Sequence, residues 1–184
     1  GTLSYGLEAD VDGLNPTFSA FSSPGYVMGN AVFDTLTAWS TDNVPVPFLA
    51  ESVTAVDGDL SKWQVKLRPG ITFHDGTPLN AEAVIKNFEL QRAAPLVGLA
   101  VRPYFPPIDG PDPAAEIIDD LTVQFNLLDQ NAWFPGSLAS QLGMVASPAW
   151  LDAAAADPAL NQQPVGTGPF VFDSRSQDSV TRFV

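Results

Sequence analysis

The chain of 184 residues contains no cysteine and a single histidine, His74. Without thiols it forms neither a disulfide nor a cysteine-based zinc site, although the absence of cysteine does not fix a cellular compartment. One imidazole cannot build a multi-histidine metal centre. We therefore expect no bound metal.

Basic residues are also scarce, with 8 Lys and Arg against 21 Asp and Glu and a net charge of -13. Such a field repels phosphate backbones and anionic lipids, so we expect neither nucleic acid nor a membrane surface as a partner. Charged residues of both signs make up only 16% of the chain. We interpret the acidity as a contribution to solubility.

Long hydrophobic runs are missing as well, since no apolar segment approaches the roughly twenty residues that span a bilayer. No signal peptide is visible, because Gly1 to Leu3 lead directly into a strand-like segment, and we interpret the chain as mature or trimmed. Hydrophobic residues make up 45%, enough for one substantial core in one domain or two small ones.

Strands are indicated by alternation with a period of two, which is clear where Trp63, Val65 and Leu67 alternate with polar residues. We predict a small sheet from Val53–Val56, Trp63–Arg68 and Leu121–Leu127, with a turn at Asp57-Gly58. A separate mixed sheet is predicted to include Thr2–Leu7 and Phe170–Asp173, and a last hairpin to join Phe170–Asp173 to Ser179–Val184.

Helices are indicated by capping residues before apolar stripes. Ser23 with Pro24 predicts a helix start, and Asn80 and Ser147 predict caps of helices that begin at Ala81 and Pro148. The segment from Ala132 to Leu142 is expected to be helical after Pro135. The first helix is predicted to bury Met28, Ala31, Val32, Thr35, Leu36 and Trp39. The aromatic residues predicted to lie in the core are Trp39, Trp63, Phe88 and Phe125.

Three patterns invite a catalytic interpretation, and each has a simpler structural one. His74-Asp75 has no third partner and no nucleophile, so we interpret it as part of a turn. Gly166-Thr167-Gly168-Pro169 lacks the lysine and spacing of a phosphate loop, and we interpret it as a turn where the backbone approaches another segment. Asp119 and Asp120 are neighbours whose side chains would diverge on a strand, so we interpret them as part of a solvated turn. We predict no cofactor and no enzymatic activity.

Four blocks of sequence resemble family 5 solute-binding proteins, the extracytoplasmic receptors of ABC importers for peptides, nickel complexes and related solutes. The blocks occur in the family's order and the third is the most specific. They are Leu14-Asn15-Pro16; Ala31 to Leu36; Leu49 to Glu82, with Leu67-Arg68-Pro69-Gly70 and Phe73 to Leu79; and Val165 to Phe170.

The resemblance implies an α/β fold, the first lobe of a type II periplasmic-binding-protein architecture with a mixed sheet, truncated before the second lobe. We expect residues 1–45 and 164–184 to form the main sheet part and residues 46–163 an inserted small α/β subdomain. The strand-like run that stops at Val184 favours a truncated chain over an ordinary C-terminal strand.

The resemblance also implies a function, that of a receptor that binds a peptide or other small solute and docks on ABC permease subunits. The expected place is extracytoplasmic, in the periplasm or as a cell-surface lipoprotein after signal removal. By family likeness and by the exposure of aromatics in loops, the ligand-binding residues are predicted to be Ser19, Ala20, Phe21, Ser22, Tyr104, Phe105, Gln141 and Met144.

A second hypothesis is a stand-alone interaction module derived from a binding protein, which a second lobe encoded downstream would exclude. An enzyme, such as a hydrolase with paired carboxylates, is a third class that no residue spacing supports. If the chain is one lobe alone, we expect it to self-associate through the strand near Val180–Val184 or through the face of Phe21 and Tyr104.

Overall fold

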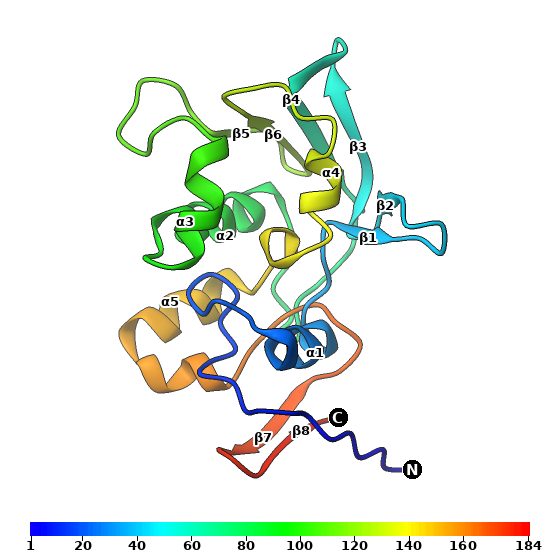
Figure 1. Ribbon diagram of the computed structural model, residues 1–184, viewed down its shortest axis with the longest axis vertical. Helices are drawn as coiled ribbons and strands as arrows, with labels where there is room; N and C mark the ends of the chain where they lie inside the picture. Colours follow the sequence, from blue (N-terminus) through cyan, green and yellow to red (C-terminus); the bar gives the residue numbers. More distant parts are fainter.

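The computed structural model describes all 184 residues. The molecule has two packing units, one above the other in Figure 1. Residues 36–143 build the upper unit, and residues 1–35 together with 144–184 build the lower unit. The chain passes between them where Thr35 forms a bridge with Met144, and the amide of Leu36 donates to the carbonyl of Gly143 at 2.9 Å. The two crossings therefore lie side by side.

The upper unit contains an antiparallel sheet of four strands in the order β3-β4-β6-β5. Its strands are β3 (Ala50–Val56), β4 (Asp59–Leu67), β5 (Ala115–Asp119) and β6 (Thr122–Asn126). The predicted small sheet is confirmed, and β5 is a strand that the sequence pattern missed. Asp57 and Gly58 both have positive φ, 50° and 78°, which produces the tight turn expected between β3 and β4.

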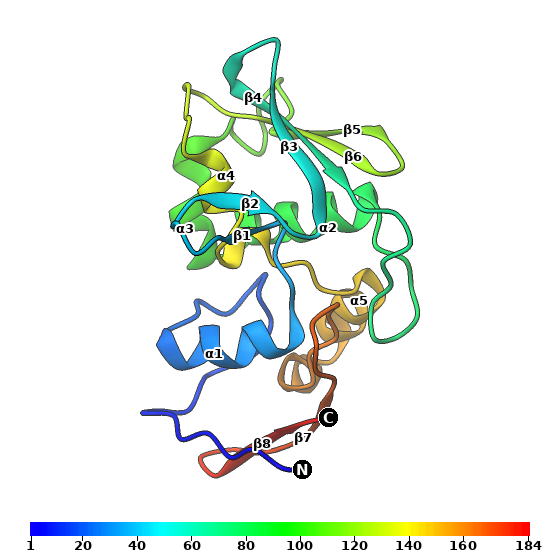
Figure 2. The ribbon, with the colours of Figure 1, turned by 90° about the vertical axis from the view of Figure 1, so that its right-hand side faces the viewer.

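Helix α2 (Ala81–Ala93) packs against this sheet, as Figures 1 and 2 show. The side chain of Asn80 accepts from the amide of Ala83 at 2.9 Å, so the predicted cap is confirmed. The ring of Phe88 meets that of Phe125 edge-on, with centroids 5.1 Å apart. Buried aromatics and aliphatics of the helix, the sheet and the loops make one core of 23 residues.

Helix α1 (Ser23–Val32) is shorter than predicted. Its N-cap residue is Ser22, one residue before the predicted helix start at Ser23. Phe33 is extended, with φ -112° and ψ 130°, so the predicted helical positions of Thr35, Leu36 and Trp39 are wrong. Strand β1 (Thr37–Trp39) pairs there with β2 (Pro45–Pro47). Trp39 is 47% exposed rather than buried, because tertiary pairing overrides the helical spacing. Trp63, Phe88 and Phe125 lie in the core as predicted.

The lower unit packs α1 against α5 (Pro148–Ala156), with Val32 and Phe33 meeting Trp150 and Leu151 in a buried cluster. Ser147 caps α5 as predicted, since its Oγ accepts from the amide of Trp150. Strands β7 (Phe172–Ser176) and β8 (Val180–Phe183) form a hairpin with no further strand beside it. The predicted last hairpin is thus confirmed.

The prediction of a mixed sheet containing Thr2–Leu7 is wrong. Residues 1–7 form no strand, and every pairing in the structure is antiparallel. A short apolar run becomes a strand only where another strand offers hydrogen bonds, and none does so here. The wider class, a mixture of helices and sheets, is confirmed.

The remaining elements are short. They are α3 (Val97–Val101), η1 (Arg102–Tyr104), α4 (Phe134–Ser137), η2 (Gln141–Gly143) and η3 (Pro158–Gln162). The helix expected within Ala132–Leu142 is reduced to the single turn of α4 and the turn of η2. No helix of the chain has the length and apolarity needed to cross a membrane.

Candidate ligand-binding site

A hollow of about 430 Å³ lies between the segment before α1, helix α3 with η1, and residues 127–142. Eighteen residues line it, thirteen of them hydrophobic. They are Ala20, Phe21, Tyr26, Gln91, Leu96, Val97, Ala100, Val101, Tyr104, Phe105, Leu127, Asn131, Trp133, Phe134, Ser137, Ser140, Gln141 and Leu142. We call this hollow the aromatic pocket; its volume is in the range of small-molecule sites.

The side-chain amide of Gln141 fixes one wall of the aromatic pocket. Its Nε2 donates to the carbonyls of Pro16 and Ser19, both at 2.7 Å, and its Oε1 accepts from the amide of Phe21 at 3.1 Å. Both donor hydrogens and one acceptor position are thus used within the protein. Gln141 therefore holds the loop that carries Ala20 and Phe21 in place.

Gln91 supports this arrangement from α2. It is fully buried, and its Nε2 donates to the backbone carbonyl of Gln141 at 3.1 Å. Its Oε1 has no hydrogen-bond partner within the chain. The two glutamines connect α2, η2 and the loop before α1 in one chain of hydrogen bonds, so the pocket wall is set by residues far apart in sequence.

The pocket brings together five of the eight residues predicted to bind ligand. Tyr104 is 56% exposed and Phe21 partly buried, whereas Phe105 is 2% exposed and lies mainly in the core. The five that line the pocket are Ala20, Phe21, Tyr104, Phe105 and Gln141. A contact of these residues with ligand stays a prediction.

The other three predicted residues do not line the aromatic pocket. The carbonyl of Ser19 accepts from Gln141, and Ser22 occupies the N-cap position of α1 without a hydrogen bond from its side chain. Met144 is 1% exposed and packs with Val32 and Phe33 in the lower unit.

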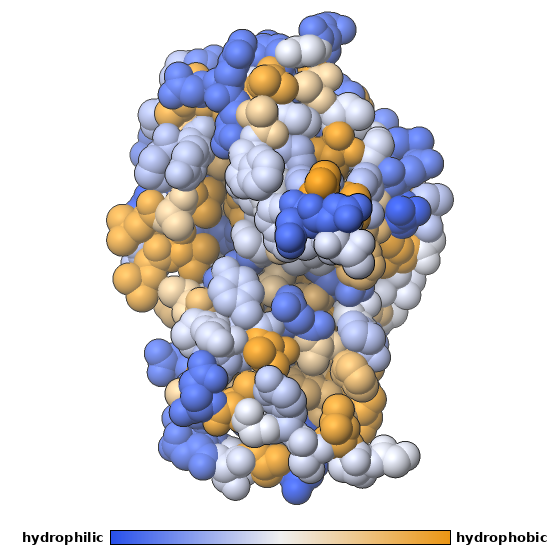
Figure 3. Space-filling view, turned by 45° about the vertical axis from the view of Figure 1, so that its right-hand side comes forward, coloured by the Kyte–Doolittle hydropathy of each residue, from blue (hydrophilic) through white to orange (hydrophobic).

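Several lining residues were not predicted, above all those of α3. The prolines from Pro95 to Pro113 indicate a loop, and five residues from Val97 to Val101 nevertheless form a helix. Trp133, 63% exposed, was visible as an aromatic residue in a loop, but nothing local indicated which loops meet. Figure 3 shows a hydrophobic area at mid-height on its left side, where Figures 1 and 2 together place α3.

His74 and the loop of Gly166 to Pro169 join the two units behind this site. The amide of His74 donates to the carbonyl of Gly166 at 2.9 Å, and its Nε2 lies 2.8 Å from the carbonyl oxygen of Gly168. A Cβ on Gly168 would lie 2.5 Å from the carbonyl carbon of Val32. The structural interpretation of both motifs is confirmed, because the backbone of this loop does press against another segment.

Two carboxyl groups near this junction have shifted pKa values. Burial raises the pKa of the Asp34 carboxyl, although a hydrogen bond from Thr167 and the nearby His74 act in the opposite direction. Burial is also the largest influence on Asp75 and would raise its pKa, but hydrogen bonds from Ser147 and Thr77 together hold that pKa below its ordinary value. Asp75 thus binds the hydroxyl that caps α5.

No cluster of three or more histidine and acidic side chains forms a candidate metal site in this chain. Asp119 accepts a hydrogen bond from the amide of Leu121 at 2.9 Å, which fits the turn expected there. A second hollow, of about 420 Å³, lies between residues 69–82 and 117–121 and contains no residue predicted to bind ligand. The aromatic pocket is therefore the candidate site.

The sequence from residue 44 to residue 184 matches the family described as bacterial extracellular solute-binding proteins, family 5 Middle. The chain belongs to family 5 of these solute-binding proteins. The resemblance noted in the sequence is thereby confirmed, and the relatives are binding proteins rather than enzymes.

Among curated relatives of this family 5 protein, the dipeptide-binding protein of Escherichia coli K12 is 28% identical over 99% of the chain and 37% of its own length. The glutathione-binding protein GsiB of Pectobacterium atrosepticum is 33% identical over 89% of the chain and 30% of its own length. The chain thus spans about a third of the length of these relatives.

Solved structures show the same fold. The dipeptide-binding protein of Pseudoalteromonas sp. SM9913, in complex with Met-Leu, superposes with a TM-score of 0.76 at 22% identity, over 96% of this chain and 38% of that one. The periplasmic binding protein DppA of Helicobacter pylori, in complex with the peptide STSA, gives a TM-score of 0.73 at 24% identity, over 94% of this chain and 36% of that one. The fold class is that of periplasmic binding proteins.

Proposed function

We propose that the chain forms the first lobe of a solute receptor serving an ABC importer, and that it takes peptides or similar small solutes. The observation that carries the proposal is the aromatic pocket, which gathers Ala20, Phe21, Tyr104, Phe105 and Gln141 in a chain of this family. Relatives of the chain include dipeptide-, glutathione- and heme-binding proteins, which supports a small-solute ligand.

In the whole protein, the aromatic pocket would be one wall of a cleft that a second lobe closes by a hinge motion. The closed receptor would dock on permease subunits outside the cytoplasm, either in the periplasm or anchored as a lipoprotein. The division into residues 1–45 with 164–184 and an inserted 46–163 stays a proposal; the buried cluster of α1 and α5 favours adding residues 144–163 to the first part.

The test is a calorimetric titration of two proteins with a mixed pool of di- to pentapeptides. One is the 184-residue chain, and the other is that chain extended by the coding sequence that follows it. We expect the longer protein to bind at micromolar strength or better and the 184-residue chain far more weakly, because half of the contacts are missing. No binding by either protein would overturn the solute-receptor function.

Micromolar binding by the 184-residue chain alone, about -8 kcal/mol, would instead show that it is a receptor by itself. Genes for a permease and an ATPase beside the coding sequence support the transport role. Their absence, together with no second lobe downstream, would favour an interaction module derived from a binding protein.

A further inference from the structure

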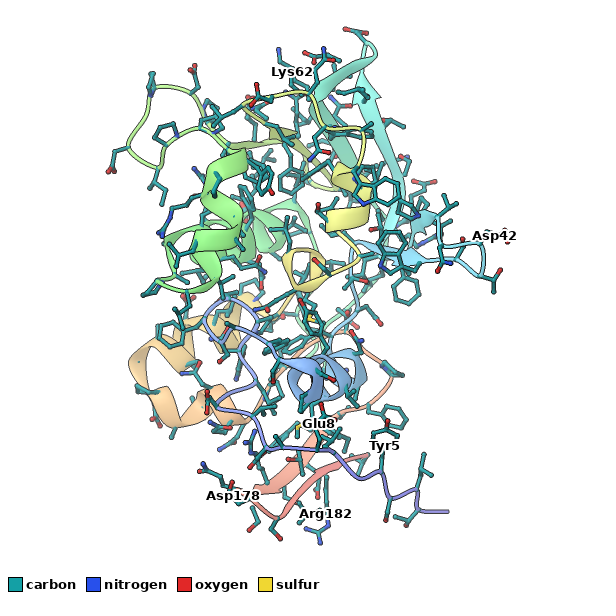
Figure 4. The ribbon with its side chains drawn as sticks, in the orientation of Figure 1. Tyr5, Glu8, Asp42, Lys62, Asp178 and Arg182 are labelled. Carbon is teal, nitrogen blue, oxygen red and sulfur yellow. The ribbon has the colours of Figure 1, made fainter.

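The aromatic pocket has no charged lining residue. None of its eighteen residues is Asp, Glu, Lys, Arg or His, although charged residues make up 16% of the chain and the net charge is -13. Figure 4 shows labelled charges such as Lys62, Asp42 and Arg182 at the outer ends of the molecule, pointing away from its middle. The pocket is thus neutral within a strongly acidic protein.

The arginines that flank the pocket wall are already engaged. Arg92 is 3% exposed, pairs with Glu89 at 2.7 Å and holds its guanidinium carbon 5.3 Å from the centroid of the Phe88 ring. Arg102, which lies between the lining residues Val101 and Tyr104, turns its Nη1 toward the carbonyl of Arg92 at 3.3 Å. Neither guanidinium is among the groups that line the pocket.

The pocket offers apolar surface and aromatic faces in place of charge. Six of its lining residues are aromatic: Phe21, Tyr26, Tyr104, Phe105, Trp133 and Phe134. Aromatic side chains contribute large contact areas and favour edge-to-face or offset contacts with another ring. A charged group placed among them would lose water without gaining a counter-ion, which is unfavourable.

We infer that this wall binds the uncharged, aliphatic or aromatic part of a solute, and that a charged end of the same solute is neutralised elsewhere. The inference rests on the proposed function and narrows it to solutes that carry a hydrophobic group. For a peptide, this means a preference for an apolar side chain at the position that meets α3 and Trp133.

The test uses probes whose ends are capped so that only the side chain differs: the N-acetyl amides of phenylalanine, leucine, glutamate and lysine. Each is titrated into the chain by NMR, with the signals of Ala100 and Trp133 as the readout. We expect the phenylalanine and leucine probes to bind at least tenfold more tightly than the glutamate and lysine probes, about 1.4 kcal/mol. The titrations are repeated at high salt, because the acidic protein attracts the cationic lysine probe at long range and salt screens this attraction.

A matched pair of variants locates the effect on α3. Ala100 is exposed and lines the pocket, whereas Leu99 is 64% exposed and does not line it. We expect Ala100→Lys to weaken the phenylalanine probe severalfold and to strengthen the glutamate probe, and Leu99→Lys to change neither. Circular dichroism and thermal unfolding confirm that both variants fold.

The inference is overturned if a charged probe binds as tightly as the apolar ones at both salt concentrations, if no probe shifts the pocket signals, or if Ala100→Lys behaves like Leu99→Lys. The peptide pool is titrated on the same sample. Binding of the pool without discrimination between probes would refute only the hydrophobic preference, whereas absence of pool binding both by this chain and by the extended protein would refute the solute-receptor function itself.

Discussion

Replacing Gln141 with methionine tests whether one buried amide holds the loop before α1 in place. The substitution keeps the length of the side chain and removes three hydrogen bonds, to the carbonyls of Pro16 and Ser19 and from the amide of Phe21. At about 1 kcal/mol net for each bond, the loss is about 3 kcal/mol. Water reaches part of this loop, since Phe18 is 60% exposed, and this reduces the expected loss to about 2 kcal/mol.

Urea denaturation measures this loss directly, and for a chain of this size it corresponds to a melting temperature lower by about 4–8 °C. Hydrogen exchange supplies a local readout, because the amide of Phe21 donates to Oε1 of Gln141 and should exchange faster in the variant. The control is Gln163→Met, since Gln163 is exposed. A change below about 0.5 kcal/mol, with unaltered exchange at Phe21, would refute the role assigned to Gln141.

Four further outcomes are expected. Gly168→Ala should destabilise the protein strongly, because the added Cβ would collide with the carbonyl of Val32. Thermal unfolding measures the loss of stability, and a variant that melts at the wild-type temperature would contradict this close packing. Asp34→Asn should raise the melting temperature more at pH 7 than near pH 4, because a carboxyl with a raised folded-state pKa costs stability only when it is ionised; an equal gain at both pH values would argue against this. Ser147→Ala removes the cap of α5 and should cost about 1 kcal/mol. The ionised carboxyl of Asp75 stabilises the fold at pH values above its unfolded-state pKa, and this stabilisation is lost as the pH falls through its lowered folded-state pKa. Because the Ser147 hydroxyl helps to lower that pKa, acid unfolding of Ser147→Ala should begin at a higher pH than that of the wild type. The open edges of β7 and β8 should allow the chain to self-associate, and light scattering should show a molecular mass that rises with concentration. A strictly monomeric chain would refute this self-association.

Local signals predicted the parts of the fold that local chemistry determines. Asn80 and Ser147 accept hydrogen bonds from amides three residues ahead, so their role as caps is visible in any short window of sequence. The alternation around Trp63 reflects a strand with one face in the core, and this too is a local pattern. Predictions failed where the partner is distant: Trp39 left the expected helix because β1 pairs with β2.

The candidate site was only partly predictable, for the same reason. Phe21 and Tyr104 stand out as aromatic residues in loops, but the pocket exists because Gln141 reaches the carbonyl of Pro16 across 125 positions in the sequence. Helix α3 lies in a proline-rich stretch whose composition indicates a loop. Burial of Gln91 gives no sequence signal at all, since a glutamine in a helix is ordinarily exposed.

The chain crosses between the two units twice, at Thr35–Leu36 and at Gly143–Met144, and this affects the order in which the units fold during synthesis. Apart from Val145, the core of the upper unit lies within residues 36–138, whereas Val32 and Phe33 pack against Trp150 and Leu151. Since synthesis proceeds from the N-terminus at about 5–20 residues per second, the upper unit is complete while the first segment of the lower unit still lacks its partner. The apolar residues of that segment therefore remain uncovered for several seconds, until Trp150 and Leu151 have been synthesised.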